Sequence, residues 1–266
     1  MVKRKKRDRA LASRWIAAAV LTVLIGLLLA LCLGPQDTPE PEAPAPIPGI
    51  DVSSHQGDID WDQVASSGVR FAIIRLGYRS YRDGMIHIDE RAQENLTEAR
   101  AAGLEIGAYF FSQALTVAEA KEEAAMALEI LDGMELDLPL AYDWEYVSPE
   151  VRTGDMEPET LTACVHTFCE EVGSAGYEPM VYFNQELSRT LLDLDTIRQY
   201  PFWYARYADE MDLDRPVLFW QHSDEGSIPG IEEAVDLDWW YPSTISLDAP
   251  NGISASDGPP PHPQAE

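Results

Sequence analysis

The sequence predicts an α/β fold, an irregular TIM-like barrel of five β/α units followed by three strands with few helices, eight strands in all. Two observations predict it. From residue 48 onward, short β-branched or aromatic runs alternate five times with helical patterns, which is typical of a parallel sheet. Three further apolar runs then follow in quick succession. An open doubly wound sheet is the alternative. It calls for a glycine-rich phosphate loop after the first strand, and residues 51–57, DVSSHQG, do not provide one.

Each element has its own local signal. The strands are rich in Val, Ile and aromatic residues, and we expect them at 49–54, 69–78, 104–112, 138–146, 177–184, 201–207, 216–223 and 233–240. Helices are predicted at 59–68, 89–103, 116–133 and 157–176, with a short helical piece after the fifth strand. Asp60 suits a helix N-cap, and Gly68 and Gly103 suit helix ends. Thr116 and Glu119 have the spacing of a capping box.

The two ends of the chain differ from its middle. Residues 15–33 carry no charge, and nineteen residues rising 1.5 Å each can just cross a hydrocarbon core of about 30 Å. We therefore expect a transmembrane signal-anchor at 15–33, with the basic segment 1–14 in the cytoplasm and the remaining chain outside. A Pro-rich linker at 34–48 and a disordered tail at 242–266 would flank one folded domain at 49–241.

A cleaved signal peptide, and therefore a secreted protein, is the alternative for the N-terminus. The apolar core of a signal peptide usually has about 7 to 15 residues and ends in a small-x-small cleavage site. The uncharged run here is longer, and residues 29–36, LALCLGPQ, contain no clear site of that kind. The anchor is therefore the favoured interpretation.

Charge and cysteine content exclude several classes of function. The formal net charge is −27, and without the basic segment 1–14 it is −33, so nucleic acid and anionic lipid are not expected partners. Cys164 and Cys169 lie five apart in a helical pattern, on different faces, which disfavours a disulfide or a cysteine metal site. The five histidines include no H-x-x-x-H pair. We expect no metal and no cofactor.

Residues 51–55 place an aspartate, two serines and a histidine side by side, which raises the question of a Ser/His/Asp hydrolase. The fold brings triad members together, and they are rarely adjacent in sequence. Neither Ser53 nor Ser54 has the flanking glycines of a G-x-S-x-G elbow. A strand that delivers side chains to a loop is the simpler interpretation.

Carboxylates fall where the predicted strands end, which is where the chemistry of such barrels collects. Because a strand has a period of two, Asp143 and Glu145 point to one side and Trp144 to the other. Two acids on one face of an apolar strand repel each other, so one keeps a proton near neutral pH while the other stays ionised. A protonated carboxylic acid beside an ionised one is the smallest set of groups that can cleave a glycosidic bond. The alternative, that acids of a very acidic protein alternate by chance, is stronger for Asp236 and Asp238.

Aromatic residues gather at or near the same strand ends. Their rings can stack on the apolar faces of sugars, while Tyr and Trp also hydrogen-bond hydroxyls. Strand aromatics are usually core, so we expect about half of the set to be structural. The set is Tyr78, Tyr109, Phe111, Trp144, Tyr182, Trp203, Tyr204, Tyr207, Trp220, Trp239, Trp240 and Tyr241.

Seven segments, in order, resemble glycoside hydrolase family 25, the lysozymes that cut peptidoglycan. They are GIDVSSHQGDIDW, FAIIRLGYR, GAYFFS, AYDWEY, WYARY, WQHS and IPGIEEAVDLDWW, and they run from Gly49 to Trp240. The resemblance implies the barrel described above. It also implies N-acetylmuramidase activity, hydrolysis of the β-1,4 bond between N-acetylmuramic acid and N-acetylglucosamine.

The resemblance also implies roles for individual residues. Glu145 would be the general acid, and Asp143 its partner, either positioning the 2-acetamido group of the substrate or acting as a carboxylate beneath the sugar. Asp51 and Asp236 would orient substrate or tune Glu145, while Ser53, Ser54 and His55 would shape the rim. The residues expected to contact substrate are Tyr78, Tyr109, Phe111, Tyr182, Trp203, Tyr207 and Gln221.

The expected partners are peptidoglycan glycan strands and, through the N-terminal helix, a membrane, with the protein a monomer. The chain shows none of the wall-binding repeats that many wall hydrolases carry. Two alternatives stay open: a non-catalytic peptidoglycan-binding barrel, and a glycosidase for another N-acetylated polysaccharide. Whether hydrolysis retains or inverts the configuration at the anomeric carbon is also open.

Overall fold

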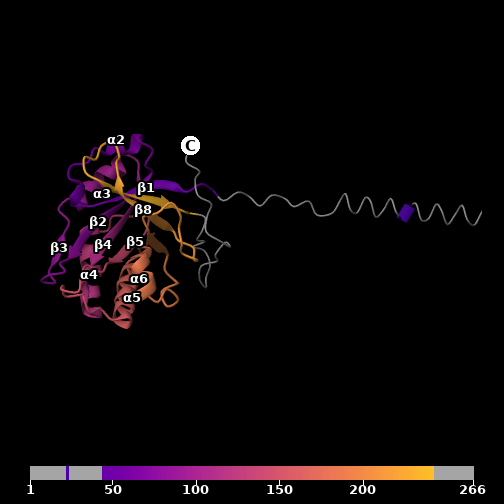
Figure 1. Cartoon of the computed structure of the whole chain (residues 1–266). Helices are drawn as coiled ribbons and strands as arrows, with labels where there is room; N and C mark the ends of the chain where they lie inside the picture. Colours follow the sequence, from indigo (N-terminus) through magenta and orange to yellow (C-terminus); the bar gives the residue numbers. More distant parts are fainter. Residues whose placement is uncertain (1–21, 24–43, 243–266) are drawn as a thin grey trace, which may run out of the picture. The chain divides into compact units, whose positions relative to one another are not determined.

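The computed structural model describes residues 22–23 and 44–242 (Figure 1). The predicted basic segment, all but two residues of the predicted anchor, most of the linker and nearly all of the tail therefore lie outside the described residues. No helix in the described part of the chain is long and apolar enough to cross a membrane.

Within residues 44–242, the strands form one sheet whose two ends meet, so that eight of them close into a barrel. The order around the barrel is β1-β9-β8-β7-β6-β5-β4-β2, and pairing of β1 with β2 closes it. These strands are β1 (Ile47–Val52), β2 (Phe71–Arg79), β4 (Glu105–Ser112), β5 (Leu140–Trp144), β6 (Pro179–Asn184), β7 (Phe202–Ala205), β8 (Phe219–Gly226) and β9 (Val235–Trp240). The predicted eight-stranded irregular barrel is confirmed.

Two features of the sheet differ from the expectation. A short strand, β3 (Ile86–Ile88), pairs antiparallel with β2 and extends it beyond the barrel. The last strand, β9, runs antiparallel to both β1 and β8, whereas its acids were expected at the C-terminal end of a strand. Because β9 is reversed, its first residues lie where the parallel strands end. Asp236 is therefore brought to that end from the beginning of its strand.

The helices begin and end largely where the sequence signals lie. The Asp60 carboxylate accepts a hydrogen bond from the backbone N–H of Gln63 at 3.0 Å and caps α2. The Thr116 hydroxyl caps α4 in the same way, through the N–H of Glu119 at 3.2 Å. Gly103, just after α3, takes a φ of 87°, which suits glycine. The helices are α2 (Trp61–Ser66), α3 (Ala92–Ala101), α4 (Val117–Leu131), α5 (Pro158–Ser174) and α6 (Gln185–Thr190).

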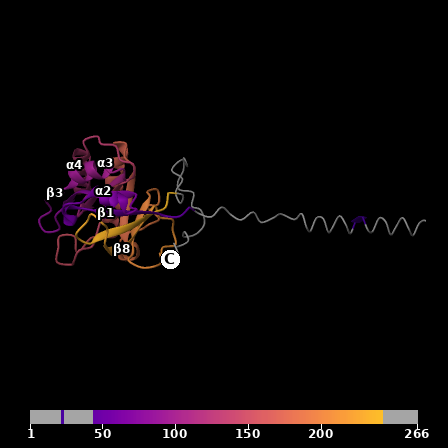
Figure 2. The ribbon, with the colours of Figure 1, turned by 90° about the horizontal axis from the view of Figure 1, so that it is seen from above.

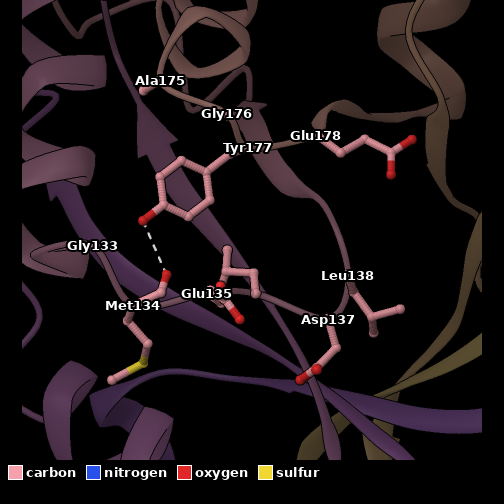
Figure 3. Close-up of a pocket in the computed structure, with 10 residues that line it drawn as sticks. Gly133, Met134, Glu135, Asp137, Leu138, Ala175, Gly176, Tyr177 and Glu178 are labelled. Atoms are coloured by element: carbon pink, nitrogen blue, oxygen red, sulfur yellow. Dashed lines mark hydrogen bonds between the residues drawn. The ribbon is translucent and has the colours of Figure 1, made fainter.

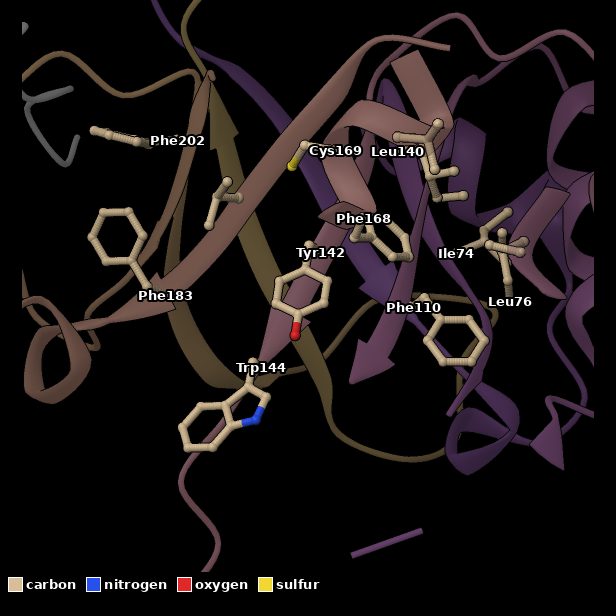
Figure 4. Close-up of a cluster of buried hydrophobic side chains, with 14 of the residues drawn as sticks. Ile74, Leu76, Phe110, Leu140, Tyr142, Trp144, Phe168, Cys169, Phe183 and Phe202 are labelled. Atoms are coloured by element: carbon tan, nitrogen blue, oxygen red, sulfur yellow. The ribbon is translucent and has the colours of Figure 1, made fainter. Parts of the chain in front are cut away.

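Strand alternation divides the apolar core into two layers. Ile73 and its neighbours fill the barrel interior, whereas Ile74 packs outward against the helices. Figure 4 shows the outer layer, where Tyr142 of β5 meets Phe168 of α5 with ring centroids 5.1 Å apart. Trp144 belongs to this outer layer. Helices α2, α3 and α4 lie on a different side of the barrel from β8 (Figure 2).

Candidate active site

The ends of the parallel strands surround a cavity of about 210 Å³. The four predicted catalytic acids all lie in its wall, although they come from three strands that are far apart in sequence. Six of the seven residues predicted to contact substrate line it as well. The acids are Asp51, Asp143, Glu145 and Asp236, and the six others are Tyr109, Phe111, Tyr182, Trp203, Tyr207 and Gln221.

Strand register explains this convergence. Asp143 lies opposite Phe111 on one side and Tyr182 on the other, and Tyr182 lies opposite Trp203. Directly paired residues point to the same face of a sheet, so these side chains form one row across four strands. On the reversed strand, Asp236 pairs with Asp51. Hydrogen-bonding register, and not proximity in the chain, therefore assembles the wall.

Asp143 and Glu145 both face the cavity, and the intervening Trp144 is buried in the outer core layer. Asp143 is only 4% exposed, whereas Glu145, one residue beyond the end of β5, is half-buried. Among the described residues, the Oδ1 atom of Asp143 has no hydrogen-bond partner. A buried acceptor without a donor is costly, and it is a position where a substrate donor would be bound favourably.

Burial controls the protonation of this pair. It raises the pKa of Asp143 well above its usual range, the charge of Glu145 raises it further, and the Arg75 guanidinium opposes both. Burial also raises the pKa of Glu145, and the Tyr182 hydroxyl opposes that rise. The two carboxyls interact, so they share their protons as a pair. The site therefore keeps a carboxyl protonated to a higher pH than a solvent-exposed acid would allow.

A second group of acids lies beside the first. Burial raises the pKa of Asp51 well above its usual range, and repulsion from Asp236 and Asp238 adds to the effect. The pKa of Asp236 rises to about 6, mainly by burial and then by repulsion from Asp224 and Glu145. Burial raises the pKa of Asp238 to about 7. Asp238 does not line the cavity, but it contacts Trp203, which does.

Hydrogen bonds hold these acids in place. The Nε2 of Gln221 donates to Oδ2 of Asp51 at 2.7 Å. The hydroxyls of Tyr182 and Tyr207 donate to Oε1 of the same glutamine, at 3.1 and 3.2 Å. The indole Nε1 of Trp203 donates to Oδ1 of Asp238 at 2.7 Å. Several of the aromatic residues predicted to contact sugar therefore also orient carboxylates.

Ser53 and His55, in the loop after β1, are not arranged as members of a catalytic triad. His55 reaches the Ser53 hydroxyl through its backbone N–H, at 3.2 Å, and not through its imidazole. The Ser53 N–H in turn donates to Oε1 of Gln56 at 2.9 Å. Ser53, His55 and Gln56 form part of the cavity wall. The backbone N–H of Ser54 binds the Asp89 carboxylate at 3.0 Å.

Sequence reasoning missed Arg75 and Gln56, which both line the cavity. Arg75 is held by buried Asp89, with Nε donating to Oδ2 at 2.8 Å, and by the Ser54 hydroxyl at 3.3 Å. A signal was present, since Arg75 interrupts the apolar run FAIIRLGY of its strand. Conversely, Tyr78, predicted to contact substrate, is not part of the cavity wall and stacks on His87.

The backbone of Glu145 is anchored from behind by Gln113, a fully buried residue. The Nε2 of Gln113 donates to the Glu145 carbonyl at 2.9 Å, and its Oε1 accepts from the Thr153 hydroxyl at 2.6 Å. Arg152 donates to the Gln113 carbonyl at 2.8 Å. This contact set ties the loop after β5 to the end of β4.

A larger cavity, of about 470 Å³, lies between residues 133–138 and 175–178 (Figure 3). These segments precede β5 and β6, so the cavity is at the N-terminal end of the parallel strands, where barrels of this kind do not place their chemistry. Within it, Tyr177 points its hydroxyl at the Met134 carbonyl, 3.0 Å away. The smaller cavity with the acids is therefore the candidate site. The described residues contain no cluster of three or more His, Cys, Asp or Glu side chains that could hold a metal ion.

Comparisons with known proteins find lysozymes and an autolysin among those similar to this chain. The chain is 28% identical over 191 residues to an autolytic lysozyme of Clostridium acetobutylicum, covering 71% of this chain and 54% of that protein. It is 27% identical over 194 residues to a lysozyme of Lactococcus phage mv1, covering 68% and 91%. The modular autolysin LytC of Streptococcus pneumoniae, solved with a synthetic peptidoglycan ligand, superposes with a TM-score of 0.65 at 27% identity, covering 74% of this chain and 47% of that one.

This chain therefore spans about half the length of the clostridial lysozyme and of LytC. Residues 50–231, more than half of the chain, match the family described as glycosyl hydrolases family 25. The matched range runs from within β1 through β8 and contains Asp51, Asp143 and Glu145, whereas β9 lies beyond it. The chain belongs to family 25 of the glycosyl hydrolases.

Proposed function

We propose that this protein is a lysozyme that hydrolyses the β-1,4 bond between N-acetylmuramic acid and N-acetylglucosamine in peptidoglycan. The observation that carries the proposal is the pair Asp143 and Glu145, which face one cavity with pKa values raised by burial. The relatives named as lysozymes support the same reaction. A barrel that only bound glycan would have no need of a buried acid pair.

Glu145 is the general acid in this proposal. Its position at the mouth of the cavity, with a raised pKa, suits a group that gives a proton to the glycosidic oxygen. The C1–O bond then breaks and its electron pair goes to the protonated oxygen. Water supplies a hydroxyl to C1, and its remaining proton returns to Glu145. The overall balance is hydrolysis with the acid regenerated.

Asp143 is the partner carboxyl. Its Oδ1 atom, which has no donor among the described residues, suits the N–H of the 2-acetamido group of the substrate. The unpartnered Oδ1 acceptor favours the positioning role over a carboxylate acting directly beneath the sugar. Asp51 and Asp236 then tune the charge of the cavity, and the aromatic wall contacts the sugar rings.

We also propose a location for the enzyme. The basic segment 1–14, the uncharged run 15–33 and the Pro-rich linker 34–48 support a single-pass anchor that holds the catalytic domain, 49–241, outside the cell. The anchor predicts that the protein stays in the membrane fraction after alkaline washing and keeps its first residues. A soluble protein that begins after residue 33 would instead show a cleaved signal peptide.

The test is turbidity loss of purified peptidoglycan with the full-length chain in a non-ionic detergent. We expect Glu145→Gln to lower the clearing rate by at least about 10³-fold, because the leaving oxygen is no longer protonated. The matched control is Glu129→Gln, the same substitution at an exposed position of α4, which should clear at the parent rate. New muramic acid reducing ends identify the bond that is cut.

Other outcomes select the alternatives. Binding of the wall by the parent without any new reducing ends would make the barrel a binding module. New reducing ends of N-acetylglucosamine from another N-acetylated polysaccharide, with none from peptidoglycan, would identify a different glycosidase. Equal clearing by the parent and by Glu145→Gln would show that the acid is another residue.

A further inference from the structure

The hairpin of β2 and β3 carries a column of stacked side chains that begins in the cavity wall and leaves it. The Arg75 guanidinium lines the cavity and lies over the Tyr78 ring, 5.3 Å from its centroid. The Tyr78 ring stacks on the imidazole of His87, with centroids 5.0 Å apart and planes 20° from parallel. His87 is exposed, so the column ends at the surface of the protein.

Register places this column on the same face as the cavity wall. His87 pairs with Tyr78, Tyr78 with Phe111, and Phe111 with Asp143. Directly paired residues point to one face, so His87 and Tyr78 continue the row that contains Asp143. Neighbouring strands are about 4.8 Å apart, and His87 is therefore about 14 Å from Asp143 along the row. Beyond the cavity, the substrate face extends over the hairpin.

The chemistry of the column fits a sugar ring. Arg75 and His87 cover the Tyr78 ring, so the exposed imidazole of His87 provides the ring surface for a sugar. The Tyr78 hydroxyl and the imidazole nitrogens can hydrogen-bond hydroxyl or acetamido groups. Tyr78 and His87 themselves lie outside the cavity wall that contains the four acids. A polymeric glycan whose scissile bond lies at Asp143 and Glu145 must continue past the cavity on at least one side.

We infer that Tyr78 and His87 form a distal subsite for a pyranose ring of the same glycan strand, outside the catalytic cavity. This inference rests on the proposed function and adds to it: the enzyme prefers long glycan strands because the hairpin binds a sugar several residues from the cut. Short fragments that fill only the cavity do not reach it.

The test measures equilibrium binding of peptidoglycan-derived glycans to the full-length chain that carries Glu145→Gln, so that nothing is cut. The affinities of an octasaccharide and of the disaccharide repeat are compared. We expect His87→Ala to lower the ratio of the two affinities about three- to ten-fold, the effect of losing one aromatic contact. Tyr78→Ala should lower it at least as much, and His87→Phe, which restores a ring, should recover most of the loss.

The control is Ile88→Ala on the same strand. Ile88 is 57% exposed and, as the neighbour of His87, points to the opposite face, so its loss should leave the ratio unchanged. Melting temperatures show whether each variant is folded. If Tyr78→Ala does not fold, the result for His87→Ala decides the test. An unchanged ratio in His87→Ala, or an equal loss in Ile88→Ala, overturns the subsite and leaves the muramidase standing. Failure of the Glu145→Gln chain to bind either glycan also overturns the subsite, while the clearing assay on the unsubstituted chain decides the muramidase separately.

Discussion

Burial raises the pKa of each carboxyl in this site to a different extent. Asp238 is 1% exposed and receives a hydrogen bond from the Trp203 indole, yet burial still raises its pKa to about 7. Asp236, nearer the solvent, rises to about 6. A charged group loses more hydration energy the more completely it is buried, so depth in the barrel sets the order of the two pKa values.

These raised values predict how stability depends on pH. The folded protein binds protons more tightly than the unfolded chain, in which both acids have an ordinary pKa of 3.8. The resulting stabilisation is fully present below about pH 4 and is lost as the pH rises through about 6 to 7. Asp238→Asn keeps the acceptor for Trp203 and removes one titrating group. We expect it to reduce the fall in melting temperature between pH 5 and pH 8 by on the order of 5 °C.

Calorimetry of the parent and of Asp238→Asn at the two pH values measures this difference. The matched control is Asp209→Asn, the same substitution at an exposed position outside the cavity wall. A fall in melting temperature of the same size in all three proteins would mean that Asp238 is ionised in the folded state.

The pH dependence of the rate should report the Tyr182 hydroxyl. This hydroxyl opposes the rise in the pKa of Glu145, so Tyr182→Phe should raise that pKa further and move the alkaline limb of the kcat profile to higher pH. Tyr207→Phe is the matched control, because it loses the same kind of bond to Gln221. An identical displacement of the limb in both variants would assign the effect to Gln221 instead.

At the scale of elements, β5 ends before its second acid, and the following loop must hold Glu145 in place. Gln113, directly after β4, donates a hydrogen bond to the Glu145 carbonyl, and the Thr153 hydroxyl orients the Gln113 amide. Glu145 and Thr153 both lie in the loop after β5, whereas Gln113 follows β4, so these bonds join two segments of the chain. A catalytic group fixed from behind by buried hydrogen bonds loses little freedom when substrate binds.

This arrangement makes Thr153 a positioning residue. Thr153→Val removes the hydroxyl at nearly constant volume, and we expect kcat to fall about ten-fold or more with KM little changed, because misplacement of a reacting group is costly. Thr153→Ser keeps the hydroxyl and should retain most of kcat. The measurement is kcat and KM on a soluble oligosaccharide, together with the melting temperature, for the parent and both variants. A fall in melting temperature with kcat intact would show a purely structural role.

At the scale of the whole molecule, the net charge of −27 opposes binding to an anionic cell wall. Salt screens such repulsion over about 10 Å, so the clearing rate of intact walls should rise a few-fold between about 0.01 M and 0.15 M salt. The rate on a short uncharged oligosaccharide should change little over the same range. A clearing rate that falls with salt would instead indicate attraction through a local basic surface.

Much of this protein follows from local patterns in its sequence. The alternation of β-branched runs with amphipathic helices determines the barrel class, because each element must bury one face. The capping residues Asp60 and Thr116 determine where two helices begin, since the unsatisfied backbone N–H groups lie within three residues of them. The two-residue spacing of Asp143, on β5, and Glu145, directly after it, sets both acids toward one side.

Only the tertiary structure decided the rest, because it depends on pairing between distant segments. Reversal of β9 brings Asp236 to the mouth from the beginning of its strand, and nothing local in the sequence sets a strand's direction. The register from β3 to β7 decides that Phe111 enters the cavity wall and that Tyr78, its neighbour in the same row, stays outside. Hydrogen-bond pairing between strands sets these positions, and it joins segments that are far apart in the chain.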